Sequence, residues 1–169
     1  MEFNYNDGGR SAAGYKGKTG DCVCRSICIA TGLPYQKIYD ELAKGNAMQR
    51  KSKHTAKKGK TAAHGINTTR KWFKDYMKSL GFEWVATMGI GTGCKVHLIA
   101  DELPKGRLVV CVSKHMTAVI DGVINDTYNP CRADSSGIAG SWMKVENGIE
   151  TRGTIGERCV YGYYILTTN

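Results

Sequence analysis

The sequence predicts an α+β fold, in which helices from the first half of the chain pack on an antiparallel sheet formed by the second half. Apolar residues recur at helical spacing up to Leu80, and from Arg107 onward they change to the β-branched runs that are typical of strands. The dipeptide Asp121-Gly122 lies between two apolar runs, which is a strong hairpin signal. Because helices come first and strands follow, we expect two separate layers.

The length and composition are those of a globular protein. The 169 residues suit a single domain spanning 1–169 with a core of its own. The hydrophobic fraction of 41% is ordinary, and no apolar run approaches the roughly 18 residues of a membrane span. The first residues lack the basic start and apolar stretch of a secretory signal. We therefore expect a cytoplasmic location and no membrane contact.

The first half of the chain contains three predicted helices. The first begins after Thr19 or Asp21, either of which can serve as N-cap, and ends at Gly32. It is apolar on most sides, so we expect it to be central and buried. A second helix spans about 35–44 and a third spans 67–80, each with apolar residues on one face.

Three segments are predicted to lie outside this framework. Residues 1–19, which are rich in Gly, Asn, Ser and Lys, form an extended or loose N-terminal arm. Residues 45–66 offer almost nothing to bury and form a basic mobile insertion. Residues 130–157 form a long connection. The remaining predicted elements are a short helix within 96–103 and strands at 82–88, 107–113, 116–120, 123–128 and 160–167.

The positive charge of the chain is concentrated in and around the predicted insertion. The formal net charge is +9, and ten basic residues with no acidic one occur between Lys44 and Lys74. Such a block favours an anionic partner, either nucleic acid or an acidic protein, although a merely solvated loop has the same composition. The residues that would contact such a partner are Lys51, Lys53, Lys57, Lys58 and Lys60.

The chain has seven cysteines, and their number and context limit what they do. An odd count without an export signal argues against a disulfide framework. Cys28 and Cys111 lie in apolar runs and are expected to pack as small hydrophobes. Metal binding and nucleophilic chemistry are the roles that remain possible for the other cysteines. A zinc site is one alternative, although its spacing matches no common motif; it would use Cys22, Cys24, Cys94 and His97.

The predicted hairpin brings a histidine and an aspartate to one face of the sheet. With Asp121-Gly122 as a two-residue turn, Thr117 lies opposite Asp126, and His115 shares the face of Thr117. His115 and Asp126 are then diagonal neighbours roughly 7–8 Å apart at the backbone, a gap that a carboxylate and an imidazole can close. The pair therefore resembles a general base and the group that orients it.

Cys22 is the predicted nucleophile. At the first turn of a helix a thiol meets unpaired backbone N–H groups and the positive end of the helix dipole. With a nearby imidazolium, these effects lower a thiol pKa from about 8.5 to roughly 3.5–7.5. Cys24 is the rival nucleophile, but it points about 200° away, so both cannot face His115. Taken singly, Cys22, His115 and Asp126 also have structural interpretations, and only their combination predicts chemistry.

These residues resemble those of papain-like cysteine peptidases. The order Cys, His, Asp is carried by Thr-Gly-Asp-Cys at 19–22, Ser-Lys-His-Met-Thr-Ala-Val-Ile at 113–120 and Ile-Asn-Asp-Thr-Tyr at 124–128. This pattern of residues is most similar to that of the compact bacterial and phage branches of the superfamily, such as the bacteriocin-leader (double-glycine) peptidases. The resemblance implies a papain-like fold with the nucleophile at a central helix start. It also implies a protein or peptide substrate, no cofactor, and a catalytic triad of Cys22, His115 and Asp126.

One part of the family pattern is missing. Many members carry a glutamine about six residues before the nucleophile, where its amide helps to bind the oxyanion, and this chain has Lys16 there. The candidates for oxyanion or substrate binding are Lys16, Lys18, Thr19 and Asp21, or Asn4 and Asn6 folded back. The resemblance implies a bacterial or phage cysteine hydrolase, either a peptidase or an amidase-type acyl transferase. The alternative is a weak or inactive papain-like module whose basic insertion binds an anionic partner.

Overall fold

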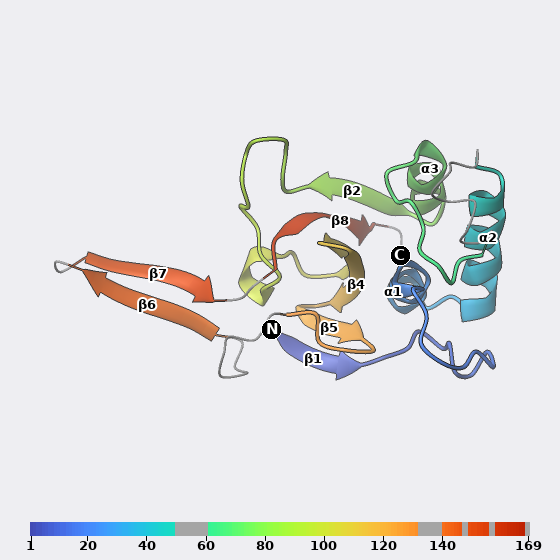
Figure 1. Ribbon diagram of the computed structural model, residues 1–169, viewed down its shortest axis with the longest axis horizontal. Helices are drawn as coiled ribbons and strands as arrows, with labels where there is room; N and C mark the ends of the chain where they lie inside the picture. The colour runs from blue at the N-terminus through green and yellow to red at the C-terminus, as the bar shows by residue number, and fades with distance from the viewer. Residues whose placement is uncertain (50–60, 132–139, 147–148, 156–157, 168–169) are drawn as a thin grey trace.

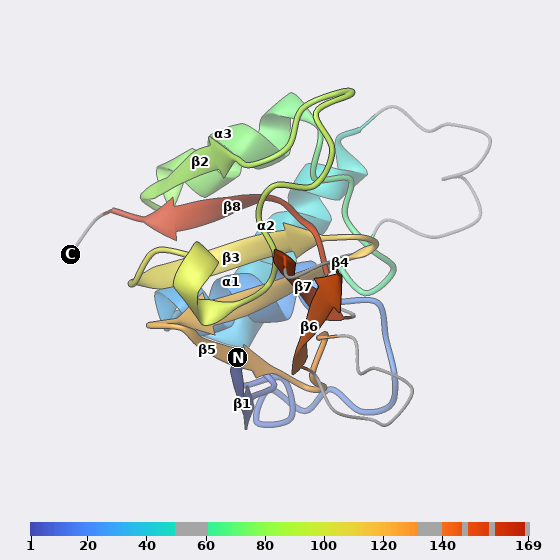
Figure 2. The same cartoon turned by 90° about the vertical axis from the view of Figure 1, so that its left-hand side faces the viewer.

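The computed structural model describes residues 1–49, 61–131, 140–146, 149–155 and 158–167. Within this part of the chain, three helices lie on one face of a six-stranded mixed sheet, which confirms an α+β architecture (Figures 1 and 2). The helices are α1 (Cys22–Thr31), α2 (Tyr35–Ala47) and α3 (Lys71–Ser79). The sheet has the order β1 (Glu2–Tyr5), β5 (Val123–Asp126), β4 (His115–Ile120), β3 (Arg107–Val112), β8 (Val160–Leu166), β2 (Phe82–Ala86).

Helix α1 is the central helix of the fold, as the sequence predicted. It packs against β4, α2 and β3, and its residues from Val23 to Ala30 are all buried. Gly32 ends it in the left-handed conformation (φ 74°) and donates its N–H to Cys28 O at 2.8 Å. At the same end, Arg107 of β3 donates to the carbonyl of Ile29 at 2.8 Å and also to the next carbonyl. These bonds tie the C-terminal end of α1 to β3.

Strand β3 is buried on both faces, which explains why its residues from Leu108 to Val112 are all apolar. Val109 packs into the core between the sheet and the helices, together with Ile27 and Phe73. Its neighbours Leu108 and Val110 point to the opposite face, into a second core. That second core is covered by the segment around the 3₁₀ turn Ala100–Glu102 and by apolar residues of the N-terminal strand; its buried members include Leu98, Leu103, Val119, Ile124 and Val160.

The hairpin that joins β4 to β5 has the predicted turn and register. Asp121 and Gly122 both have positive φ, 51° and 87°, as a type I′ turn requires. Ile120 pairs with Val123, and the ladder continues to Ala118 and Asn125. The Asp121 carboxylate accepts a hydrogen bond from Gly106 N at 2.9 Å, which ties the turn to the start of β3. The turn therefore decides which side chains of β4 and β5 face α1.

The N-terminal segment was predicted to be an extended or loose arm outside the sheet, but its first residues join the sheet, which is therefore not purely antiparallel. Residues Glu2–Tyr5 form β1, which pairs in parallel with β5 from Glu2↔Val123 to Tyr5↔Asp126. Phe3 packs against the second core, and Asn4 donates a side-chain hydrogen bond to Asn125 at 2.9 Å. So short and polar a strand has little signal of its own, because its pairing depends on the edge that β5 offers more than a hundred residues away.

The predicted long connection at 130–157 is also wrong where the structure describes it. Residues Gly140–Glu146 (β6) and Ile149–Ile155 (β7) pair as an antiparallel two-stranded sheet. The helix expected within 96–103 shortens to the 3₁₀ turn at 100–102, and α3 begins at Lys71 because residues 67–69 form a turn around the Asn67 side chain. The helix expected at 35–44 extends through Ala47.

Two of the seven cysteines form a disulfide, contrary to the expectation from their odd number. Cys94 and Cys159 are joined with their Cα atoms 5.6 Å apart. The bond links the segment after β2 to the start of β8, where His97 and Cys159 also form an isolated bridge. Within the described ranges, no helix combines the length and apolar character needed to cross a membrane.

We predict that Gly122→Ala destabilises the fold by about 1–2 kcal/mol, the usual cost of placing an L-residue in the left-handed region. The added Cβ would also lie 2.8 Å from Lys105 Nζ. Urea unfolding monitored by circular dichroism measures the change. Gly89→Ala is the matched control, because its φ is not in the positive range and the nearest atom is a methyl group at 3.3 Å. Equal decreases in the free energy of unfolding of the two variants would contradict the role given to the turn.

Candidate active site

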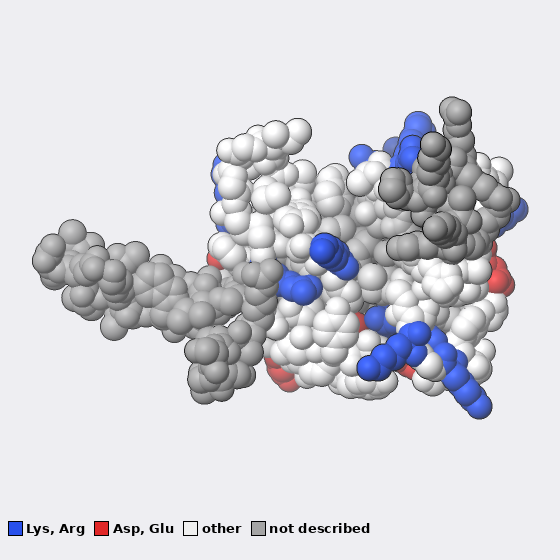
Figure 3. Space-filling model, in the orientation of Figure 1, with Lys and Arg blue, Asp and Glu red and all other residues white. Residues whose placement is uncertain are grey.

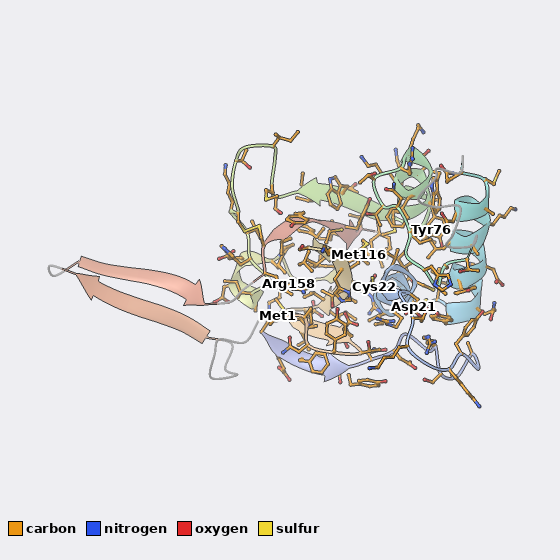
Figure 4. All side chains as sticks on the ribbon, in the orientation of Figure 1. Met1, Asp21, Cys22, Tyr76, Met116 and Arg158 are labelled. Atoms are coloured by element: carbon orange, nitrogen blue, oxygen red, sulfur yellow. A yellow bond between two sulfur atoms is a disulfide. The ribbon has the colours of Figure 1, made fainter. Side chains whose placement is uncertain are left out.

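Cys22 is the first residue of α1 and lines an open cavity of about 840 Å³. In Figure 4 it lies at the end of the helix, between Met116 of β4 and Asp21. The cavity walls come from the start of α1, the β3–β4 turn, β8 and the segment at 64–68. The lining residues with apolar or small side chains are Gly20, Val23, Gly65, Ile66, Cys111, Val112 and Met116.

His115 and Asp126 form a buried hydrogen-bonded pair beside Cys22. The tight turn at Ser113-Lys114, in which Lys114 has a φ of 56°, sets His115 opposite Val112 as the first residue of β4. Nε2 of His115 lies 2.7 Å from Oδ2 of Asp126, and the two residues are 8% and 3% exposed. The structure thus brings together the three residues that the sequence singled out as a triad.

Electrostatics favour a protonated His115 in this position. Burial alone would lower the pKa of its imidazole, but hydrogen bonds with Asp126 and Cys22 and the charges of both raise the pKa from 6.5 to about 9. For Asp126, burial acts in the upward direction, yet the hydrogen bond and charge of His115 and the N–H of Thr127 hold the pKa of the carboxyl below its usual value. The pair is therefore an imidazolium–carboxylate pair at neutral pH.

The thiol of Cys22 is shifted toward the thiolate. Burial acts to raise its pKa, but the net direction is downward. The causes are a hydrogen bond with the His115 side chain, one with the backbone of Met116, and the positive charges of His115 and Arg25. Because Asp126 occupies Nε2 of His115, the nitrogen left for the thiol is Nδ1. The lowered pKa of the thiol and the raised pKa of the imidazole both favour a thiolate–imidazolium pair.

The other cysteines near the site lack this activation. Cys24, the rival nucleophile, is fully buried with its Sγ 3.9 Å from the carbonyl of Tyr35, and a hydrogen bond with Cys28 and burial raise its thiol pKa. Cys111 lines the same cavity as Cys22, but burial and the charge of Cys22 raise its pKa to about 12. The zinc alternative fails, because Cys22 and Cys24 face different surroundings and Cys94 is in a disulfide.

The residues predicted to bind the oxyanion or substrate do not line the cavity of Cys22 in the described structure. Thr19 donates its hydroxyl to Ala63 O at 2.6 Å, and Asp21 is fully buried among cations. Lys16 is exposed, and its carbonyl accepts a hydrogen bond from Arg10. Lys18 lines a different pocket, the Asn4 side chain bonds Asn125, and that of Asn6 accepts the N–H of Gly8.

Two features of the site escaped the sequence interpretation. The first is Arg25, a buried arginine of α1 that contacts both Asp21 and Asp126. The spacing of Asp21 and Arg25, four residues apart on one helix face, was the signal available for it. The second is the wall at 61–66, where Gly20 N donates to Ala63 O at 2.8 Å and Gly20 bridges His64. The sequence had assigned this wall to a mobile insertion.

The five lysines of the predicted basic contact, Lys51, Lys53, Lys57, Lys58 and Lys60, fall in 50–60 and so outside the described residues. An anionic partner therefore stays a prediction. On the face drawn in Figure 3, Lys and Arg side chains are more conspicuous than Asp and Glu, in keeping with the net charge of +9. Comparisons with protein-family models, curated proteins and solved structures found no match.

We predict that Asp126→Asn lowers the pKa of His115 by about one unit or more, because a neutral amide does not stabilise an imidazolium as a carboxylate does. An NMR titration of the histidine ring signals measures the shift from the wild-type value of about 9. Asn125→Ala is the control, since that side chain lies on the same strand but bonds Asn4 and Val123 O. A wild-type His115 that titrates near 6.5 would contradict the assignment.

Proposed function

We propose that the chain is a papain-like cysteine hydrolase, a peptidase or an amidase-type acyl transferase, with Cys22 as nucleophile. The observation that carries the proposal is the placement of one imidazole between a buried carboxylate and a thiol that opens into a cavity. His115 binds Asp126 through Nε2 at 2.7 Å and interacts with Cys22 on its other side. An activated thiol, a base and an orienting carboxylate are the parts that acyl transfer requires.

The reaction begins with the thiolate of Cys22 attacking the acyl carbon of an amide. A carbon–sulfur bond forms and the carbonyl becomes an oxyanion. On collapse of this intermediate the carbon–nitrogen bond breaks, and His115 donates its Nδ1 proton to the departing amine. Water, deprotonated by the then neutral His115, attacks the thioester and releases the acid, which returns the thiolate and the imidazolium. Asp126 keeps Nε2 protonated and the ring oriented throughout.

The start of α1 supplies the oxyanion donors. As the first residues of a helix, Cys22 and Val23 have backbone N–H groups without an intrahelical acceptor, and the helix dipole adds positive potential there. The carboxylate of Asp21 is occupied by Arg10, Arg25 and Tyr35, so it does not compete for these N–H groups. Donors fixed before the reaction stabilise the developing charge most effectively.

The cavity favours an extended peptide or acyl chain as substrate. Gly20 and Gly65 present backbone without side chains on the wall beside Cys22, which lets a substrate backbone approach closely. Val23, Ile66 and Met116 supply apolar surface for a neighbouring side chain. Backbone pairing together with one apolar contact is a common way to hold an extended chain.

We predict that iodoacetamide alkylates Cys22 faster than any other thiol of the folded protein at neutral pH. Cys22 ionises at its lowered pKa and His115 stays protonated up to about 9, so the rate rises at a lower pH than for an ordinary thiol and then levels off. Mass spectrometry of tryptic peptides identifies the site. His115→Ala should slow the reaction at pH 7 about tenfold, because the thiol loses its counter-ion.

Cys111→Ala serves as the matched control, because it removes the second thiol of the same cavity. That variant should keep the wild-type alkylation profile. A Cys22 that reacts no faster than the exposed thiol of a small peptide, across pH 5 to 9, would rule out the hydrolase.

A further inference from the structure

Arg25 is a buried cation that joins two carboxylates beneath the site. It lies on α1 one turn after Cys22 and is 7% exposed. Nη1 pairs with Oδ1 of Asp21, and Nη2 lies 3.5 Å from Oδ1 of Asp126. A guanidinium is a rigid planar fork, so fixing one of its nitrogens restricts where the other points.

The Asp21 end of this bridge is anchored by residues from two other parts of the chain. Nε of Arg10, from the N-terminal segment, lies 3.0 Å from Oδ2 of Asp21, and the hydroxyl of Tyr35 from α2 donates to the same oxygen at 2.6 Å. Asp21 itself has no exposed surface. With cations on both oxygens and a hydroxyl donor as well, this carboxylate is a fixed point for the guanidinium of Arg25.

At the other end, the two oxygens of Asp126 have separate partners. Oδ1 accepts the N–H of Thr127 at 2.7 Å and faces Arg25, while Oδ2 is engaged by His115 at 2.7 Å. A carboxylate turns easily about its last side-chain bond. Holding Oδ1 therefore determines where Oδ2 lies relative to the imidazole.

We propose that Arg25 is a positioning residue of the site: by bridging Asp21 to Asp126 it keeps Oδ2 of Asp126 in line with Nε2 of His115. The inference rests on the proposed function for its consequence in catalysis, but its geometric claim stands on the contacts alone. The charges alternate along the network, which runs through Arg10, Asp21, Arg25, Asp126, His115 and Cys22.

A positioning role and a simple charge effect predict opposite changes in the pKa of His115 when Arg25 is removed. If Arg25 acted only as a neighbouring cation, its removal would make it easier to protonate His115 and would raise the imidazole pKa. If it positions Asp126, its removal weakens the hydrogen bond that sustains the imidazolium and lowers that pKa. The other groups close to the pair are Tyr128, whose ring lies 5.0 Å from that of His115, and Cys111 beside Cys22; both remain in either case.

The test is an NMR titration of His115 in Arg25→Met and Arg25→Lys. Both should lower the pKa of His115 from about 9 by about one unit or more. Lys retains the charge but loses the fork, so it isolates geometry from charge, and it carries the test if Arg25→Met does not fold. Arg107→Lys is the matched control, because Arg107 also bonds α1, through carbonyls at the far end of the helix, and should leave His115 unchanged.

An unchanged or raised His115 pKa in Arg25→Lys would overturn the positioning role. A fall of the His115 pKa in Arg107→Lys equal to that in Arg25→Lys would overturn it as well. Alkylation rates of Cys22 in the same proteins separate this inference from the proposed function. We expect Arg25→Lys to slow alkylation at pH 7 by about tenfold, in line with the sensitivity of such sites to small displacements. If wild-type Cys22 is alkylated no faster than an ordinary thiol, the proposed hydrolase function is rejected. The titration of His115 still decides the role of Arg25 in that case.

Discussion

The site depends on the packing of α1 across β4, because that contact sets the first residue of a helix, Cys22, beside the first residue of a strand, His115. Ile27 on the helix and Val109 and Met116 on the sheet share one buried core, so the thiol and the imidazole are held by apolar packing rather than by a flexible loop. Functional groups on rigid elements keep their geometry better than groups on loops. Asp126, at the end of β5, completes the site from the next strand.

Burial gives the site its electrostatic character. A carboxylate, an imidazolium and a guanidinium that are shielded from water interact more strongly than they would on a surface. Each of them therefore needs a partner of opposite charge. The structure meets this need by alternation: Asp126 lies between His115 and Arg25, and Asp21 lies between Arg25 and Arg10. The same partners that make burial tolerable also favour the imidazolium and the thiolate.

The sequence was sufficient at two points where a strong local signal sets the structure, although it missed the local pairing of β6 with β7. Gly32 ended α1, and Asp121-Gly122 fixed the register that puts His115 and Asp126 on one face, as both predictions required. It was insufficient where distant segments meet. Strand β1 depends on the free edge of β5, and the contact of Arg25 with Asp126 spans about a hundred residues. Charges and polar strands of this kind carry no periodic signal, so only the folded arrangement reveals them.

We propose that Cys22 forms an acyl-enzyme with the help of His115. The most direct test is the reaction with p-nitrophenyl acetate at pH 7, followed by absorbance and by mass spectrometry of the labelled peptide. We predict a rapid burst of p-nitrophenol with the acetyl group on Cys22, lost in Cys22→Ala and strongly reduced in His115→Ala. The absence of a burst, or acetylation spread equally over Cys22, Cys111 and Cys131, would contradict it.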